Sequence, residues 1–144
     1  MNLTKVIPDE QRGLGYVETV VRNPLIPHKP HPKQRLFLML SDVREVMYGG
    51  AGGGGKSDAL LMAAAQYLHV PGYAALIVRR NLTDLRLPNA LLERSMAWWT
   101  GKGKYDAANR RWRFACPGGG ESTLTFGYLD RDLSVYQYQS AEFQ

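Results

Sequence analysis

The sequence predicts an α/β fold in which parallel strands are flanked by helices. The first observation is that an apolar run at 43–48, an apolar helix pattern at 57–68 and a second apolar run at 74–78 follow one another with short connections. Such a strand–helix–strand succession is typical of parallel strands. The second observation is that the side chains alternate in character at 111–116 and 123–128, on either side of a turn. This alternation predicts an antiparallel β-hairpin in the C-terminal third.

Composition supports one globular domain and excludes several classes of protein. The 144 residues are 44% hydrophobic, an apolar content that disordered sequences lack. The one cysteine, Cys116, excludes disulfide scaffolds and zinc fingers, and we expect it to be a small buried apolar residue. No apolar run approaches the ~20 residues that span a bilayer, and residues 1–10 lack the pattern of a signal peptide. We therefore expect an intracellular protein without a membrane partner.

An N-terminal arm precedes the predicted domain. Residues 1–23 are polar and weakly patterned. The four prolines from Pro24 to Pro32 favour an extended path, because proline fixes φ and lacks the amide donor that a helix needs. We assign residues 1–31 to an extended arm and residues 32–144 to the domain.

Three helices are expected in the domain. Pro32 suits the first turn of a helix over 32–41, because the amide it lacks would have no partner there. The helix formers at 57–68 are apolar almost all round, which indicates burial on more than one side. Apolar side chains and Ser95 share one face of a third predicted helix over 88–99.

A glycine-rich stretch between the strand predicted at 43–48 and the helix predicted at 57–68 matches the phosphate-binding loop (P-loop) pattern G-x-x-x-x-G-K-[ST]. Successive backbone N–H groups must wrap a polyphosphate closely there, and glycine allows both the close approach and positive φ values. The N-terminus of the following helix also favours phosphate. A flexible glycine linker is the alternative, but a linker would not have this spacing between a strand and a helix. The residues expected to contact nucleotide phosphates are Gly50, Ala51, Gly52, Gly53, Gly54, Gly55, Lys56 and Ser57.

The two polar residues of the motif have distinct expected roles. Lys56 would meet the β- and γ-phosphate oxygens as a point charge, and the Ser57 hydroxyl would ligate Mg²⁺. ATP and Mg²⁺ are therefore the expected ligands of the loop.

Pro32-Lys33-Gln34, the stretch from Tyr48 to Leu60, Leu76-Ile77-Val78-Arg79-Arg80, and Thr123 to Tyr128 together resemble the start of a phage terminase large subunit. The resemblance covers most of the chain. It implies an incomplete P-loop NTPase domain of RecA-like type, belonging to an ATPase that pumps double-stranded DNA into a procapsid. It further implies a ring of identical subunits, a small terminase subunit and a portal as partners, and the host cytoplasm as location.

The same resemblance implies roles for single residues. Gln34 matches the glutamine that such motors place against adenine, and a solvated glutamine is the alternative. Arg79 and Arg80 follow the strand at 74–78, at the edge where α/β sheets bind ligands. They are weak catalytic candidates, able to face phosphates or DNA or simply to solvate the exit loop.

Hydrolysis needs an Asp-Glu pair after an aliphatic strand, and this chain has none. In terminases that strand follows the point that corresponds to Gln144, so we expect a chain that stops before it. We predict negligible ATP hydrolysis by this chain and a weakly stable fold. The alternatives are a nucleotide-binding remnant without turnover and a helicase-like or other P-loop NTPase. The reading frame beyond Gln144 would discriminate between motor and remnant, because an aliphatic run ending in Asp-Glu there favours the motor and a stop codon favours the remnant.

The remaining polar residues carry weaker signals. The net charge of +5 favours polyanionic partners. The densest basic stretch, 102–113, has aromatic side chains interleaved and could touch a nucleic-acid backbone, but its strand pattern favours a solvated face. The three histidines, His28, His31 and His69, have no metal-ligand spacing, and we expect surface or cap roles for them.

Overall fold

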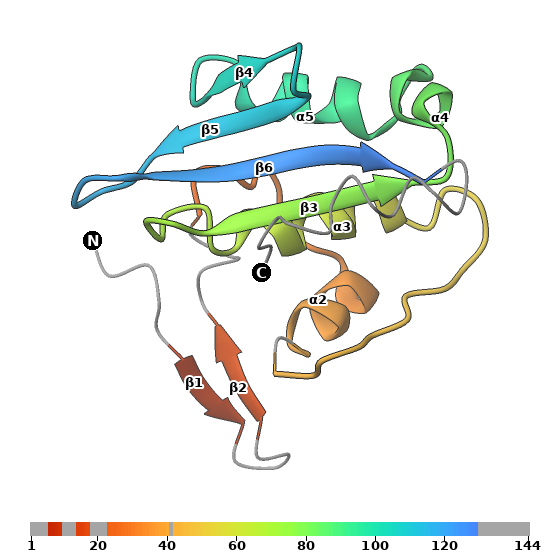
Figure 1. Ribbon diagram of the computed structural model, residues 1–144. Coiled ribbons are helices and arrows are strands. Elements are labelled where there is room, and N and C mark those ends of the chain that lie inside the picture. The colour runs from red at the N-terminus through yellow and green to blue at the C-terminus, as the bar shows by residue number, and fades with distance from the viewer. Residues whose placement is uncertain (1–5, 10–13, 18–22, 41, 130–144) are drawn as a thin grey trace. The chain divides into compact units, whose positions relative to one another are not determined.

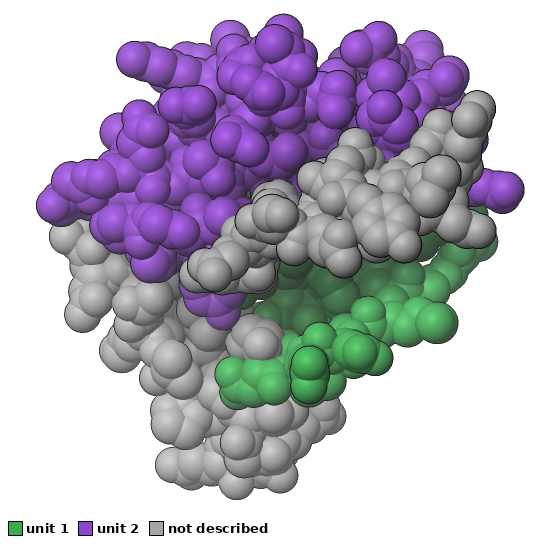
Figure 2. Space-filling view, viewed as in Figure 1, with its two compact units in different colours: residues 1–66 green, residues 67–144 purple. Residues whose placement is uncertain are grey.

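The computed structural model describes residues 6–9, 14–17, 23–40 and 42–129 (Figure 1). The chain divides into two compact units, residues 1–66 and residues 67–144, which Figure 2 shows in different colours. The glycine-rich loop belongs to unit 1, and the larger β-sheet belongs to unit 2.

Unit 1 contains a β-hairpin and two helices. Strands β1 (Val6–Asp9) and β2 (Leu14–Val17) pair antiparallel, in a region whose weak pattern predicted no strand. Helix α2 (Pro32–Leu38) begins at the predicted proline. Helix α3 (Lys56–Ala65) follows the glycine loop, and the predicted helix is therefore confirmed but ends three residues early.

Helix α2 is stabilised at its N-terminus by a capping box. The N-cap is His31, whose ring accepts a hydrogen bond from the Gln34 N–H, while the Gln34 side chain accepts one from the His31 N–H. Such reciprocal bonds satisfy N–H groups that have no partner inside the helix. The expectation of a cap role is thus confirmed for His31.

Helix α3 is buried on several sides, as its composition predicts. Its fully or nearly fully buried side chains belong to Ala59, Leu61, Met62, Ala64 and Ala65. These positions are not confined to a single stripe, so the helix lacks the amphipathic pattern of a surface helix.

The proline-rich segment 23–31 runs along α3 in the opposite direction. At one end, the Asn23 side chain donates to the Ala65 carbonyl oxygen at 2.8 Å. Near the other end, His28 Nε2 lies 3.4 Å from Asp58 Oδ2 in the first turn of α3. The segment is therefore tied to both ends of α3 through side chains.

Unit 2 is built on a mixed four-stranded sheet with the order β3-β6-β5-β4 (Figure 1). Strand β3 (Ala74–Arg79) pairs parallel with β6 (Glu121–Tyr128). Strand β5 (Arg111–Ala115) pairs antiparallel with β6 and with the short β4 (Lys104–Asp106). The predicted strand at 74–78 and the predicted hairpin are both confirmed.

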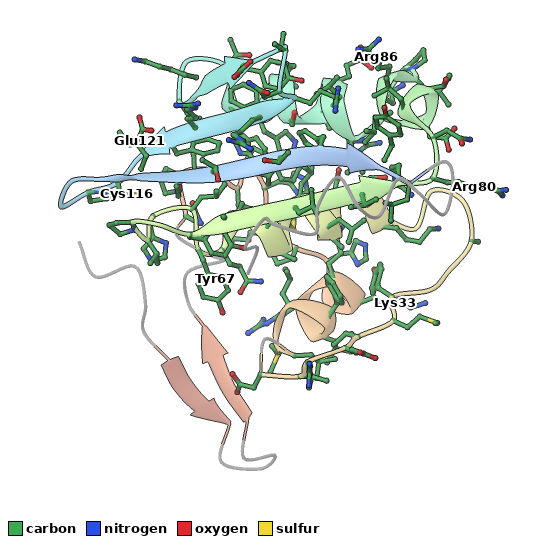
Figure 3. The ribbon with its side chains drawn as sticks, in the orientation of Figure 1. Lys33, Tyr67, Arg80, Arg86, Cys116 and Glu121 are labelled. Atoms are coloured by element: carbon green, nitrogen blue, oxygen red, sulfur yellow. The ribbon has the colours of Figure 1, made fainter. Side chains whose placement is uncertain are left out.

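Helices α4 (Leu82–Arg86) and α5 (Leu91–Trp99) connect β3 to β4. Trp99 of α5 packs edge-on against Trp112 and Phe114 of β5, with ring centroids 5.8 and 5.4 Å apart. All three rings are buried, and Cys116 beside them is buried as well, as predicted. Figure 3 shows Cys116 and Glu121 at the turn end of the β5–β6 hairpin.

Two predictions about the sheet are wrong. The sheet is mixed rather than purely parallel, because the glycine-rich turn after Pro117 is short enough to join only antiparallel neighbours. The segment 43–48 is not a strand. A strand persists only by hydrogen bonding to a neighbour, and 43–48 pairs with no described strand. Met47 is 96% exposed, which confirms that the run is not buried.

No helix in the described ranges combines the length and the apolar character needed to cross a bilayer.

Candidate phosphate-binding loop

The glycine-rich residues 49–55 form an open turn that leads into α3. Gly50, Gly53 and Gly55 have φ values of 149°, 77° and 72°, in the region that side chains other than glycine rarely adopt. A Cβ atom added to Gly50 or Gly53 would meet no atom within 4 Å. These two glycines are therefore required by backbone conformation, and space beside them is free.

The backbone of this turn offers donors without acceptors. The Gly54 N–H donates to the Ala51 carbonyl oxygen at 3.3 Å. The N–H groups of 50–53 and 55–57 have no acceptor within the described part of the chain. Those of Lys56 and Ser57 belong to the N-terminus of a ten-residue helix, whose dipole favours an anion.

Lys56 places its ammonium over the turn. Its Nζ donates to the carbonyl oxygens of Gly50 at 2.8 Å and Ala51 at 2.7 Å. An ammonium has three protons, so one remains for a further acceptor. The side chain thus holds a positive charge on the same short loop that carries the unpaired N–H groups.

Ser57 is half-buried in the first turn of α3, and its hydroxyl has no partner among the residues that the structure describes. A hydroxyl oxygen is a ligand that Mg²⁺ accepts together with phosphate oxygens and water. In the described ranges, no three His, Cys, Asp or Glu side chains gather into a metal-binding group.

Gln34 lies against the last glycine of the loop. Its Nε2 donates to the Gly55 carbonyl oxygen at 2.9 Å. The residue is only 2% exposed, so the alternative of a solvated glutamine is wrong. Contact with adenine stays a prediction.

Tyr48 contacts the loop and was not predicted as a site residue. The Tyr48 hydroxyl lies 3.4 Å from the Gly54 carbonyl oxygen, to which it donates. Its ring is 5.1 Å from the ring of Phe37 on α2. Tyr48 directly precedes the glycines in sequence, and that position is the only signal that could have indicated it.

Arg79 and Arg80 belong to unit 2. Arg79 is the last residue of β3 and half-buried, and Arg80 is exposed. Figure 3 shows Arg80 extending away from the end of β3. Their roles toward a phosphate or DNA stay predictions.

The basic stretch of β4 and β5 is organised by the sheet. Trp112 and Phe114 are buried, as the strand pattern predicts. Arg111 donates to the Thr125 hydroxyl at 3.0 Å. Lys104 and Arg113 are exposed and directly opposite each other in register, and the Arg113 guanidinium helps to lower the pKa of the nearby Asp106 carboxyl.

Comparison of the chain with protein-family models, with curated proteins and with solved structures finds no match.

Proposed function

We propose that the loop at 50–57 binds the triphosphate of ATP together with Mg²⁺, and that the chain is the ATP-binding part of a DNA-packaging motor of the terminase large-subunit type. The first half of the proposal is supported by the described geometry of the loop. The second half is supported by the sequence resemblance, which extends through 123–128.

One observation carries the phosphate-binding half. Unpaired backbone N–H groups, the Lys56 ammonium and the Ser57 hydroxyl all lie on one short loop at the start of α3. Each of these groups is a donor or a cation ligand, and none is a carboxylate. Such a set favours a polyanion over a neutral or cationic ligand.

The residues divide the binding among them. The N–H groups of the loop would donate to non-bridging phosphate oxygens, and Lys56 would add a positive charge at the outer phosphates. The Ser57 hydroxyl would ligate Mg²⁺, which offsets phosphate charge when bound. The positive φ values at Gly53 and Gly55 let successive N–H groups turn toward one point.

Isothermal titration with a non-hydrolysable ATP analogue and Mg²⁺ tests the proposal. We expect Lys56→Ala to weaken binding about ten- to a hundredfold, because a hydrogen bond to a charged group is worth about 1.5–3 kcal/mol. The matched control is Lys33→Ala, which removes the same charge from an exposed position on α2. The control should bind within about twofold of the wild type.

Two results would contradict the proposal. If the wild type shows no binding heat at millimolar concentrations of the analogue, the proposal that the chain binds nucleotide is wrong. An equal loss for Lys33→Ala and Lys56→Ala would show that only net charge matters, and the loop would then not be the site.

A further inference from the structure

We infer that Gln34 acts as a positioning residue for the phosphate-binding loop rather than as a reader of the adenine base. This inference rests on the proposed function of the loop. It assigns Gln34 to the backbone of Gly55, the residue that joins the loop to α3.

The Gln34 amide uses both of its polar atoms inside the protein. The Oε1 atom accepts from the His31 N–H at 3.0 Å, and the Nε2 atom donates to the Gly55 carbonyl oxygen at 2.9 Å. These two bonds fix the orientation of the amide plane, and they link the N-cap of α2 to the N-cap of α3.

The backbone conformation of Gly55 determines how the loop enters α3. It is the N-cap of α3, and its φ of 72° and ψ of 18° lie in the left-handed region. Its carbonyl oxygen also accepts the first helical bond of α3, from the Ala59 N–H at 2.9 Å. One oxygen is therefore shared between Gln34 and the first turn of the helix.

The fit around Gly55 is tight. A Cβ atom on Gly55 would stand 2.6 Å from Gln34 Nε2 and 2.7 Å from His31 Nε2. Because Lys56 and Ser57 follow Gly55 directly, a change in the Gly55 carbonyl direction rotates both residues relative to the turn. Gln34 thus controls the direction of the expected phosphate ligands without touching the phosphate.

Burial argues against contact with a base. Gln34 is 2% exposed, so adenine could reach its amide only after the side chain had left Gly55 or His31. A buried amide that loses its hydrogen-bond partners is destabilised, and a contact with the base would first have to offset that loss. The observed bonds favour the positioning role.

The experiment compares two ligands with and without a base. Gln34→Met removes both hydrogen bonds at similar length, and binding of Mg²⁺–ATP analogue and of inorganic triphosphate with Mg²⁺ is measured by isothermal titration. We expect both affinities to fall by the same factor, about three- to tenfold. The matched control is Gln66→Met, which changes a buried glutamine at the other end of α3 whose Oε1 has no hydrogen-bond partner among the described residues, and it should leave both affinities unchanged.

Amide hydrogen exchange provides a readout without ligand. We expect Gln34→Met to speed exchange of the Ala59 amide about three- to tenfold, because the Gly55 carbonyl that it bonds is released. The Gln66 amide, which donates to the Met62 carbonyl oxygen, should keep its rate. Gln34→Glu keeps the length and the acceptor but lacks the donor, so it serves as a second variant if Gln34→Met does not fold.

The outcomes separate the two hypotheses. A weaker ATP analogue with unchanged triphosphate affinity would assign Gln34 to the base and overturn the inference. Unchanged affinity together with unchanged Ala59 exchange would also overturn it. If the wild type binds no triphosphate, the proposed function fails, whereas faster Ala59 exchange in the variant would still support the link between Gln34 and Gly55.

Discussion

At the scale of single residues, Ser95 shows how one hydroxyl can satisfy two elements. Its Oγ donates to the Leu92 carbonyl oxygen at 2.7 Å within α5 and accepts from Trp112 Nε1 on β5 at 3.0 Å. Ser95 has no exposed surface, and Trp112 is 2% exposed. Since a buried indole N–H needs an acceptor, this serine fixes the position of the tryptophan.

We expect Ser95→Ala to lower the free energy of unfolding by about 1–3 kcal/mol, because it leaves the Trp112 N–H buried without an acceptor. Urea denaturation followed by tryptophan emission measures the change. The matched control is Ser122→Ala, at an equally buried serine that donates to the Leu68 carbonyl oxygen and accepts from no indole. A loss for Ser95→Ala no larger than that for the control would contradict the importance of the indole bond.

The sequence places Ser95 on the buried face of its helix but does not indicate its partner. Spacing along a helix identifies which side chains share a face, whereas the contact with Trp112 depends on how β5 packs 17 residues later. The same holds for the candidate site. The glycine pattern locates the loop, but the contact of Gln34 with Gly55 spans 21 residues and required the structure.

At the scale of elements, the turn between β4 and β5 is closed by a carboxylate. Asp106 accepts from the Asn109 side chain at 2.7 Å and from the Asn109 N–H at 3.1 Å. These bonds hold the pKa of Asp106 below its ordinary value of 3.8, and the bond from the Asn109 side chain has the largest effect. The residue after Asn109, Arg110, has a positive φ of 50°, which completes the turn.

Because the pKa of Asp106 is lower in the folded state, its contribution to stability is present above the unfolded-state value and is lost as pH falls through the folded-state value. We expect Asn109→Ala to raise the pKa of Asp106 toward 3.8 and to flatten the pH dependence of stability below about pH 4. Carbon-13 NMR titration of the carboxyl group measures the pKa. An identical titration curve for wild type and variant would contradict this account.

Which elements could be predicted depended on the length and the period of each pattern. β5 alternates between buried and more exposed side chains along its five residues, and the alternation of residue types at 123–128 predicted most of β6, although Leu124 to Gly127 are all buried. β4 has three residues, too few to show a period. The apolar run at 43–48 looked like a strand, but a strand also requires a partner, and local sequence does not report one.

At the scale of the whole molecule, charge is the property that the sequence states most directly. The excess of 18 basic over 13 acidic residues gives +5. The ion pair between His28 and Asp58 lies in unit 1 and involves neither a lysine nor an arginine. The like charges of Lys104 and Arg113 face each other across two strands, and the Asp106 carboxylate, whose pKa the charge of Arg113 helps to lower, offsets part of their repulsion.

We expect short double-stranded DNA to bind with an affinity that falls as salt rises, since neutralising phosphates releases counterions. Replacing Lys104 and Arg113 by glutamine together should reduce the slope of log K against log salt by about 2. The slope is measured by fluorescence anisotropy of labelled DNA at salt concentrations between about 50 and 200 mM, the range over which such binding weakens strongly.

The control for that measurement is the pair Lys29→Gln and Lys33→Gln, which removes the same charge from two exposed positions in unit 1. We expect it to change the slope by less than half as much. Equal slopes for the two double variants would show that DNA responds to total charge alone and that β4 and β5 offer no preferred surface.

The sheet of unit 2 ends on one side at β4, which has only three residues and carries the exposed Lys104. A second molecule that tried to extend the sheet there would gain few backbone hydrogen bonds and would have to desolvate an ammonium group. Fibre growth at that edge of the sheet is therefore disfavoured, so the Lys104 ammonium helps to keep the protein from polymerising.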